Sequence, residues 1–384
     1  MRLSQAISRD DSRFSASQID ELSALEPHLV LCFADPVFFT DRAEELRRLK
    51  AACPGAIVLG CSSAGEISST GVTLGRAVAT AVHFAEPGIS CAIEPIADMA
   101  DSEASGERLG RQLAASCPHT VIVFGQGVRL NGSALIRGLR RALGASVALV
   151  GGLAGDSGRF ERTHVIAGDR VSDAHLVAVG LSSSRMRVTH GVFGGWRPFG
   201  PVRRVTRSAG NVLFELDGEP ALAVYRRYLG DEAAKLPASA LLFPFSMLDD
   251  ALKETGVTRT ILGLDESSGS ITLAGEILDD GFLRLMCANP DDIINGAEVA
   301  AESAAVASAD RNSTSFALLV SCVGRRLALG QRIEEEVEAV AAVLGAQCTL
   351  AGFYSNGEIS SYGASPEMQL HNQTMTVTRF VEVA

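Results

Sequence analysis

Three segments of the chain combine glycines with an acidic residue and, in two of them, hydroxyl or amide side chains. They span residues 60–66, 151–156 and 352–358, and each follows an apolar run. Glycine lets a ligand approach the backbone, serine and asparagine offer hydrogen bonds, and a carboxylate could hold an ammonium group. The candidate ligand-binding residues are Ser62, Ser63, Gly65, Glu66, Gly151, Gly152, Gly155, Asp156, Ser355, Asn356 and Glu358. The alternative is plain turn chemistry, because Gly, Asn and Asp tolerate the positive φ angles of tight turns.

A further candidate is the loop at residues 190–201, which holds the only Trp of the chain among four Gly and two Pro. Trp196 could form the apolar wall of a pocket. The adjacent Arg197 could clamp a carboxylate or a phosphate through two parallel hydrogen bonds. The alternative is a rigid loop with a buried Trp and a solvated Arg, although loops often carry function.

An enzymatic alternative uses Ser62 or Ser63 as a nucleophile. Residues 60–64 resemble the G-x-S-x-G turn of serine hydrolases, but Ala64 occupies the position of the last glycine. A hydrolase also needs a histidine that is oriented by an acid; His190 is the best placed, but no neighbour in the sequence orients it. Dinucleotide-binding and P-loop motifs are absent from the sequence. We therefore expect a protein that is not an enzyme, and keep a serine hydrolase as an alternative.

Haem is a cofactor that the sequence leaves open. A Cys thiolate can ligate haem, and Cys-Pro pairs occur at residues 53–54 and 117–118. Each pair falls where a helix is predicted to end, and Pro is common there for structural reasons. The histidines in strand-like contexts are His83, His164, His175 and His190. No metal site is indicated, because no C-x-x-C or comparable ligand spacing occurs.

Each of the three glycine-rich segments ends a strand–helix–strand unit, and this unit repeats along the chain. First strands are predicted at residues 29–33, 121–124 and 317–321, and returning strands at 56–60, 147–150 and 347–351. The helices between them show apolar residues at helical spacing. The first begins near Asp41, the second begins at Asn131 and ends at Gly144, and the third ends at Gly345. Strand-like sequence follows each repeat and predicts added antiparallel hairpins.

This pattern predicts an α+β fold, that is, a mixed α/β protein with mixed sheets covered by helices. A strand–helix–strand unit crosses over to make a parallel pair, whereas hairpins add antiparallel strands. We expect a mobile arm at residues 1–26, a first domain at 27–217 and a second at 218–384, with the boundary near Asp217 and Gly218.

Composition limits the classes of partner. The chain has 384 residues, of which 47% are hydrophobic and 21% charged, so it has enough apolar material to fold. No apolar run approaches the ~18 residues of a membrane helix, and the polar start is not a signal peptide. The net charge of −11 disfavours nucleic acid. Eight scattered Cys and no secretion signal indicate reduced thiols and a cytoplasmic protein.

Taken together, residues 60–66, 150–156, 194–201 and 352–358 make the chain similar to FIST-domain proteins. The resemblance covers nearly the whole chain, with an N-terminal FIST domain at about residues 27–217 followed by a C-terminal FIST domain. It implies a sensory module of signal transduction that binds small ligands such as amino acids. Some relatives resemble haem proteins that sense nitric oxide and act on a neighbouring histidine kinase or cyclic-di-GMP enzyme.

The resulting hypothesis is a cytoplasmic sensor that binds an amino-acid-like ligand in a cleft lined by the glycine-rich strand ends. Its signal would pass to a separate protein such as a histidine kinase or a cyclic-di-GMP enzyme, without contact to nucleic acid or a membrane. A haem-based nitric-oxide sensor is the first alternative, and a serine hydrolase is the second.

Overall fold

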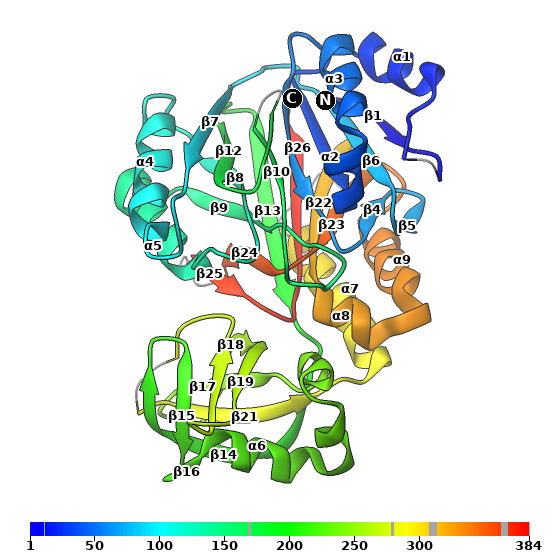
Figure 1. Ribbon diagram of the computed structural model, residues 1–384. Coiled ribbons are helices and arrows are strands. Elements are labelled where there is room, and N and C mark those ends of the chain that lie inside the picture. The colour runs from blue at the N-terminus through cyan, green and yellow to red at the C-terminus, as the bar shows by residue number, and fades with distance from the viewer. Residues whose placement is uncertain (11, 168–169, 278–279, 307–312, 362–367, 384) are drawn as a thin grey trace.

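The chain folds into a large body and a smaller one below it (Figure 1). The computed structural model describes residues 1–10, 12–167, 170–277, 280–306, 313–361 and 368–383. Both termini lie together at the end of the large body farthest from the small one, where the Met1 ammonium pairs with Glu382 at 2.8 Å. Among the described residues, no helix is both long and apolar enough to cross a membrane.

The large body consists of three repeats of the same order of elements. The first repeat contains β1 (Arg2–Ile7), α1 (Ala16–Ala24), β2 (Leu29–Ala34), α2 (Pro36–Asp41), α3 (Ala43–Ala52), β3 (Ile57–Ser62), β4 (Glu66–Ser68), β5 (Gly71–Thr73) and β6 (Ala77–His83). The second contains β7 (Ile89–Pro95), α4 (Ser102–Ala114), β8 (Thr120–Gly125), α5 (Gly132–Leu143), β9 (Ala148–Leu153), β10 (Val165–Ala167), β11 (Arg170–Ser172) and β12 (His175–Leu181). In both, strand and helix alternate twice before a hairpin and a last strand.

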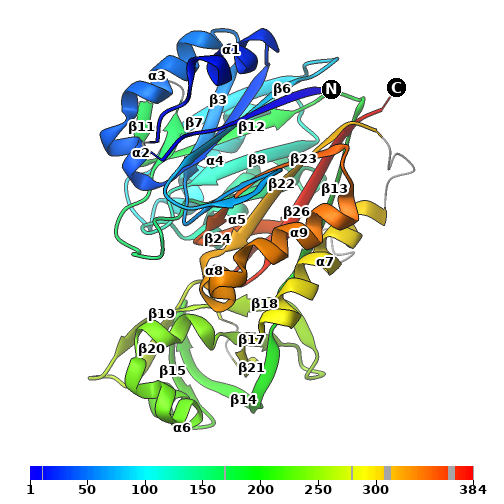
Figure 2. The ribbon, with the colours of Figure 1, turned by 90° about the vertical axis from the view of Figure 1, so that its right-hand side faces the viewer.

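The third repeat has the same order but is interrupted after its first strand. It contains β13 (Met186–Phe193), α7 (Pro290–Val306), β22 (Ser315–Cys322), α8 (Val323–Leu329), the 3-10 turn η3 (Gly330–Arg332), α9 (Ile333–Leu344), β23 (Cys348–Ser355), β24 (Gly357–Ser361), β25 (Met368–His371) and β26 (Met375–Glu382). Helices α7, α8 and α9 lie together beside the sheet of this repeat (Figure 2). The smaller body is inserted between β13 and α7, where the other repeats have a short loop.

Each repeat gives its hairpin to the sheet of another repeat. The three six-stranded sheets run β1-β6-β2-β3-β10-β11, β7-β12-β8-β9-β24-β25 and β13-β26-β22-β23-β4-β5. In each, the two central strands are parallel and all other pairs are antiparallel. The first repeat therefore adds β4 and β5 to the third sheet, the third adds β24 and β25 to the second, and the second adds β10 and β11 to the first.

The inner faces of the three sheets meet in one apolar core. Phe33 on β2, Phe124 on β8 and Phe353 on β23 come from different sheets and are each at most 1% exposed. Their ring centroids lie 4.7–5.7 Å apart, which is the range of favourable aromatic pairs. This cluster fixes the three sheets around a common axis.

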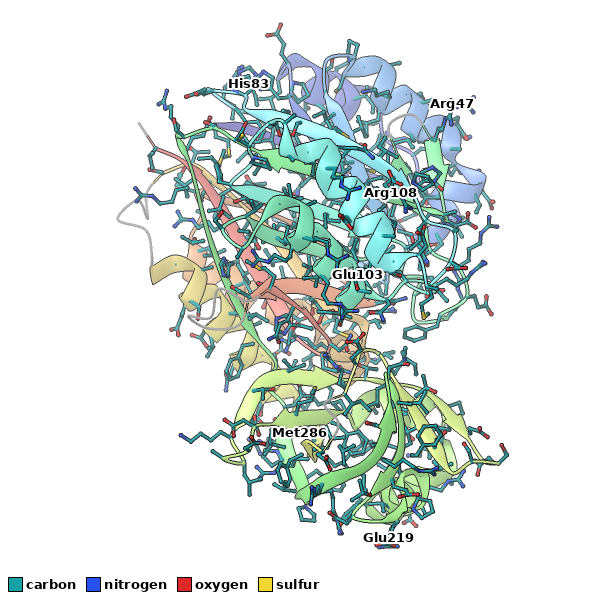
Figure 3. The ribbon with its side chains drawn as sticks, turned by 90° about the vertical axis from the view of Figure 1, so that its left-hand side faces the viewer. Arg47, His83, Glu103, Arg108, Glu219 and Met286 are labelled. Atoms are coloured by element: carbon teal, nitrogen blue, oxygen red, sulfur yellow. The ribbon has the colours of Figure 1, made fainter. Side chains whose placement is uncertain are left out.

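The smaller body is a curved sheet packed on a helix. It contains β14 (Arg197–Ala209), β15 (Val212–Leu216), β16 (Glu219–Pro220), α6 (Ala221–Leu229), η1 (Gly230–Lys235), η2 (Ala238–Leu242), β17 (Phe245–Leu248), β18 (Glu254–Arg259), β19 (Ile261–Asp265), β20 (Ser270–Leu273) and β21 (Phe282–Cys287). Because β18 pairs with β17 and the directly following β19 pairs with β20, the sheet closes on itself. We call this body the inserted barrel; Glu219 lies at its far end (Figure 3).

The predicted α+β class and all three strand–helix–strand units are confirmed. The expectation of a mobile arm at residues 1–26 is wrong. Strand β1 pairs with β6 over six residues, and Phe14, Ile19 and Leu22 are buried in the core of the first repeat. The boundary expected near Asp217 and Gly218 falls in the turn between β15 and β16, inside the inserted barrel.

Candidate functional site

The three glycine-rich turns meet at one end of the large body. Each continues the second parallel strand of its repeat, and backbone hydrogen bonds join the three in a closed ring. The bonds run from Ala64 N to Tyr354 O (2.8 Å), from Gly155 N to Ser62 O (2.9 Å) and from Asn356 N to Leu153 O (3.1 Å). The structure therefore brings the three predicted segments together, as the repeat implied, but in direct contact with one another.

In the first turn, Glu66 is buried and bonded to its own repeat. The Ser63 hydroxyl donates to Glu66 Oε1 at 2.5 Å, while the Arg76 backbone N–H and the Thr73 hydroxyl donate to Oε2 at 3.2 and 3.3 Å. Ser62 is also buried; its hydroxyl donates to Gly155 O at 2.7 Å and accepts from the His164 backbone. These groups hold the turn in place.

In the third turn, Glu358 has the same arrangement. The Ser355 hydroxyl donates to Oε1 at 2.6 Å, and both the backbone N–H and the hydroxyl of Thr374 donate to Oε2, at 3.2 and 2.9 Å. The residue is fully buried. Asn356, next to it, donates to Gly127 O at 3.3 Å. A bonded Ser–Glu pair is thus present in two of the three repeats.

Asp156 does not match these two acids. Gly60, Gly151 and Gly352 occupy equivalent positions, because each is paired with the first parallel strand at the same point of its sheet. Counting onward from them, the equivalent of Glu66 and Glu358 is Ser157. Asp156 instead accepts three backbone N–H bonds at 2.7–3.1 Å from residues 160–162 and shapes the loop before β10. The acid of the second turn is therefore not equivalent to those of the other two.

Burial gives the two glutamates an unusual protonation. It raises the pKa of both Glu66 and Glu358 to about 8, against the hydrogen bonds from serine and threonine, which act in the opposite direction. In the unfolded chain such a carboxyl has lost its proton at neutral pH, whereas the folded protein keeps it. The raised pKa therefore contributes to the stability of the folded protein at pH values below the pKa of the unfolded chain. This contribution is lost as the pH rises through the pKa of the folded protein.

We expect Glu358→Gln and Glu66→Gln to be increasingly stabilised relative to the parent protein between about pH 5 and about pH 9, by about 2 kcal/mol or more at the alkaline end. Glutamine mimics the protonated acid and has no charge to bury. The measurement is the midpoint of thermal unfolding across this pH range, with Glu334→Gln on the exposed surface of α9 as control. A pH-independent difference would show that both carboxyls ionise normally.

The Trp–Arg loop lies at the joint between the two bodies. Trp196 is 9% exposed; it packs with Met286, Ile293 and Leu329, and its indole N–H donates to Gln373 O at 2.7 Å. Figure 3 shows Met286 within the inserted barrel. The loop is also held by Arg325, whose guanidinium donates to Gly194 O. Of the loop predicted at residues 190–201, only residues 194–196 lie outside strands β13 and β14; they carry the chain from the large body into the barrel, and we call this joint the hinge.

Two pockets flank this loop and share Phe193, Gly195 and Trp196. The first, of about 60 Å³, is also lined by Gly194, Ser246, Glu254, Gly256, Thr258, Met286 and Thr374. The second, of about 250 Å³, is also lined by Arg197, Asp292, Asn295, Gly296 and Val299. Arg197 Nη2 donates to Asp292 Oδ1 at 2.7 Å, so this guanidinium already has an acidic partner at the second pocket. We call the two the small and the large hinge pocket.

The third turn reaches the small hinge pocket through two residues of the β25–β26 connection. Gln373 accepts the Trp196 indole bond, and the next residue, Thr374, lines the pocket and bonds Glu358. The structure thus links Trp196 to Glu358, two of the predicted residues. Glu66 and Asp156 line neither hinge pocket.

No sequence pattern marks the pocket residues Ser246, Glu254 and Thr258. They come from the consecutive strands β17 and β18, and each looks like an ordinary polar residue of a strand. A signal does exist for Thr374, because it directly precedes β26 as Arg76 precedes β6, and both bond the glutamate of their repeat.

The histidines and cysteines do not converge on these pockets. Neither hinge pocket is lined by a His or a Cys, and no group of three or more His, Cys, Asp or Glu within the described ranges could hold a metal. His190 contacts the Ser361 hydroxyl, His175 the Ser172 hydroxyl and His83 the Glu26 carbonyl. The residues around the hinge therefore do not fit a haem.

Two comparisons with known proteins give limited information. An alignment over 159 residues is 34% identical to an uncharacterized protein of Methanocaldococcus jannaschii; it covers 37% of this chain and 29% of that protein, so the chain spans less than a third of the relative. The crystal structure of cyanuric acid hydrolase from A. caulinodans matches 99% of this chain and 98% of its own with 10% identity and a TM-score of 0.38, too low to support any functional inference.

The family comparison is decisive. The FIST N domain matches residues 28–219 and the FIST C domain matches residues 221–361, in the order and almost the extent that the glycine-rich segments and the Trp–Arg loop indicated. FIST domains are sensor domains of signal transduction. The chain belongs to the FIST family, with an N-type domain followed by a C-type domain.

Proposed function

We propose that this protein is a sensor that binds a small, amino-acid-like ligand at the hinge between the large body and the inserted barrel. The small hinge pocket supports this most directly. Its lining comes from both bodies: Gly194 and Thr374 from the large one, Ser246 and Thr258 from the barrel. A ligand held between two bodies changes their relative position when it binds one arrangement better than the other.

The charges around the hinge favour a ligand that carries an ammonium group. Glu254 lines the small pocket and is exposed, so its carboxylate is open to a hydrogen bond from an ammonium group. Hydroxyl groups of Ser246, Thr258 and Thr374 add acceptors. Arg197 stands at the large pocket on the other side of Trp196 and is available to a carboxylate that displaces Asp292.

A thermal-shift screen of the amino acids and simple amines tests this function. We expect at least one compound to raise the unfolding temperature, because a ligand that binds only the folded state stabilises it. Glu254→Gln should weaken the response about tenfold in ligand concentration, the effect of about 1.4 kcal/mol. Glu334→Gln, an exposed glutamate on α9, is the matched control and should respond like the parent. No response to any compound would contradict the proposal.

We propose a binding role rather than catalysis, with the output passed to a separate signalling protein such as a histidine kinase or a cyclic-di-GMP enzyme. Both serines considered as nucleophiles are fully buried; Ser62 donates to the Gly155 carbonyl and Ser63 to the Glu66 carboxyl, so neither is bonded to a histidine and neither is open to a substrate. Labelling of Ser62 or Ser63 by a fluorophosphonate probe would speak for a hydrolase instead.

A further inference from the structure

Thr374 connects the buried carboxyl of Glu358 with the small hinge pocket. Its hydroxyl is bonded to that carboxyl at 2.9 Å, and the residue lines the pocket. A hydroxyl has a single hydrogen to donate but two lone pairs to accept with. The direction of the bond to Glu358 therefore decides what Thr374 can offer to the pocket.

We propose that Glu358 acts as a protonation switch that sets whether Thr374 presents a hydrogen-bond acceptor or a donor to the small hinge pocket. With an ionised carboxylate, the threonine hydrogen must point at Glu358, which leaves its lone pairs for a ligand N–H. With a protonated carboxyl, Glu358 can donate to the threonine oxygen, and the threonine hydrogen turns towards the pocket. The inference rests on the proposed function only in taking this pocket as the ligand site.

The surroundings of Glu358 make it the group that changes charge. On β25, His371 lies opposite it in the sheet, and burial lowers the pKa of that imidazole to about 4. At the end of β22, burial raises the pKa of the Cys322 thiol well above its usual value. The Arg325 guanidinium on α8 pairs with Glu336 and favours ionisation of Glu358, and the neighbour on β9 is Gly152. The carboxyl of Glu358 itself has its pKa raised to about 8 by burial.

The ligand class follows from the ionised state. A carboxylate behind Thr374, together with Glu254 at the pocket, favours a cation that carries N–H groups, that is, a primary ammonium or a similar head group. Binding such a cation stabilises the ionised form of Glu358, so the protein should release a proton as it binds near neutral pH. Ligand binding and the loss of the Glu358 proton are then coupled, so the affinity for the ligand depends on pH.

The switch can be observed without any ligand. Trp196 is the only tryptophan of the chain and lines the same pocket, so its fluorescence reports the state of Glu358. We expect its emission to shift with a midpoint near pH 8 in the parent protein. The shift should persist in Glu66→Gln, which removes the equivalent acid of the first repeat, and vanish in Glu358→Gln. A shift that survives in Glu358→Gln, or a parent protein without one, overturns the switch.

The hydrogen-bond polarity is tested with two cations of the same charge. Methylammonium has N–H donors and tetramethylammonium has none. In the parent protein, the affinity for methylammonium should rise about tenfold or more between about pH 6 and about pH 9. The affinity for tetramethylammonium should rise less over the same pH range. Thr374→Val lacks the hydroxyl but keeps the backbone N–H. In this variant, the affinities for the two cations should rise by the same factor between the two pH values.

The outcomes separate the two proposals. A larger gain for methylammonium that persists in Thr374→Val contradicts the role of the threonine. If methylammonium binds at neither pH, the ammonium site of the proposed function is wrong, while the fluorescence titration still decides whether Glu358 switches. Thermal unfolding of each variant at about pH 6 establishes that it is folded before either experiment.

Discussion

Gly60→Ala is expected to prevent folding, or to lower the free energy of unfolding by more than about 4 kcal/mol. Gly60 lies on β3 directly opposite Cys32 on β2. A Cβ atom there would stand 1.8 Å from the Cys32 carbonyl oxygen, and the residue has a φ of +156°. The clash is with backbone in the middle of a parallel pair, so no side chain can move to relieve it.

A matched control lies close by in the chain. Gly55, in the turn before β3, has no atom within 4 Å of the position that an alanine methyl group would take. Gly55→Ala should therefore change stability by less than about 1 kcal/mol. The measurement is the yield of soluble protein and its denaturant unfolding curve. If Gly60→Ala unfolds at the same denaturant concentration as Gly55→Ala, then β2 and β3 are not packed as the structure shows.

Arg325→Met is expected to cost about 3–5 kcal/mol of folding free energy. Arg325 and Glu336 form an ion pair at 2.8 Å in which both side chains are fully buried. Removing the guanidinium leaves the Glu336 carboxylate in the interior, bonded to the hydroxyls of Ser321 and Tyr354 but without a compensating positive charge from Arg325. An uncompensated buried charge of this kind is far more costly than the loss of a surface pair.

The loss should also reach the hinge. Arg325 donates to Gly194 O, where the chain leaves the large body, and to Ile293 O at 2.8 Å, where it has returned. Arg332→Met is the control and should have little effect, because the pair that Arg332 makes with Glu335 is exposed to solvent. The double change Arg325→Met with Glu336→Leu should recover much of the loss in chemical denaturation. A single variant no worse than Arg332→Met would contradict this role.

The repeat can be predicted well from the sequence because it is local. Each strand–helix–strand unit occupies a continuous stretch whose apolar spacing and closing glycine are visible without any partner. The first helix is predicted only in part: Asp35 caps an additional short helix with Pro36 at its first position, and the expected helix begins after it at Ala43. The N-terminal strand escapes prediction because residues 2–7 are mostly half-exposed and become a strand only by pairing with β6.

The candidate site is predicted only in part, because its residues are joined by contacts between segments that are distant in the sequence. Trp196 and Glu358 are recognisable by type, but the contact that joins them runs through Gln373 and Thr374, which no local pattern marks. Asp156 is not equivalent to Glu66 and Glu358, because the second repeat places its acid one position earlier than the other two. The inserted barrel is hidden because its strands β14 and β21 pair across about eighty residues of sequence.

The exchange of hairpins among the three sheets has a consequence for how the large body holds together. In a solenoid, a terminal repeat can unravel and leave its neighbours intact, because each unit touches only the next. Here β4 completes the third sheet, β24 the second and β10 the first. Unfolding any one repeat removes its own sheet and strips the outer strands from another, and the ring has no terminal repeat from which fraying can begin. The large body is therefore expected to unfold as one cooperative unit.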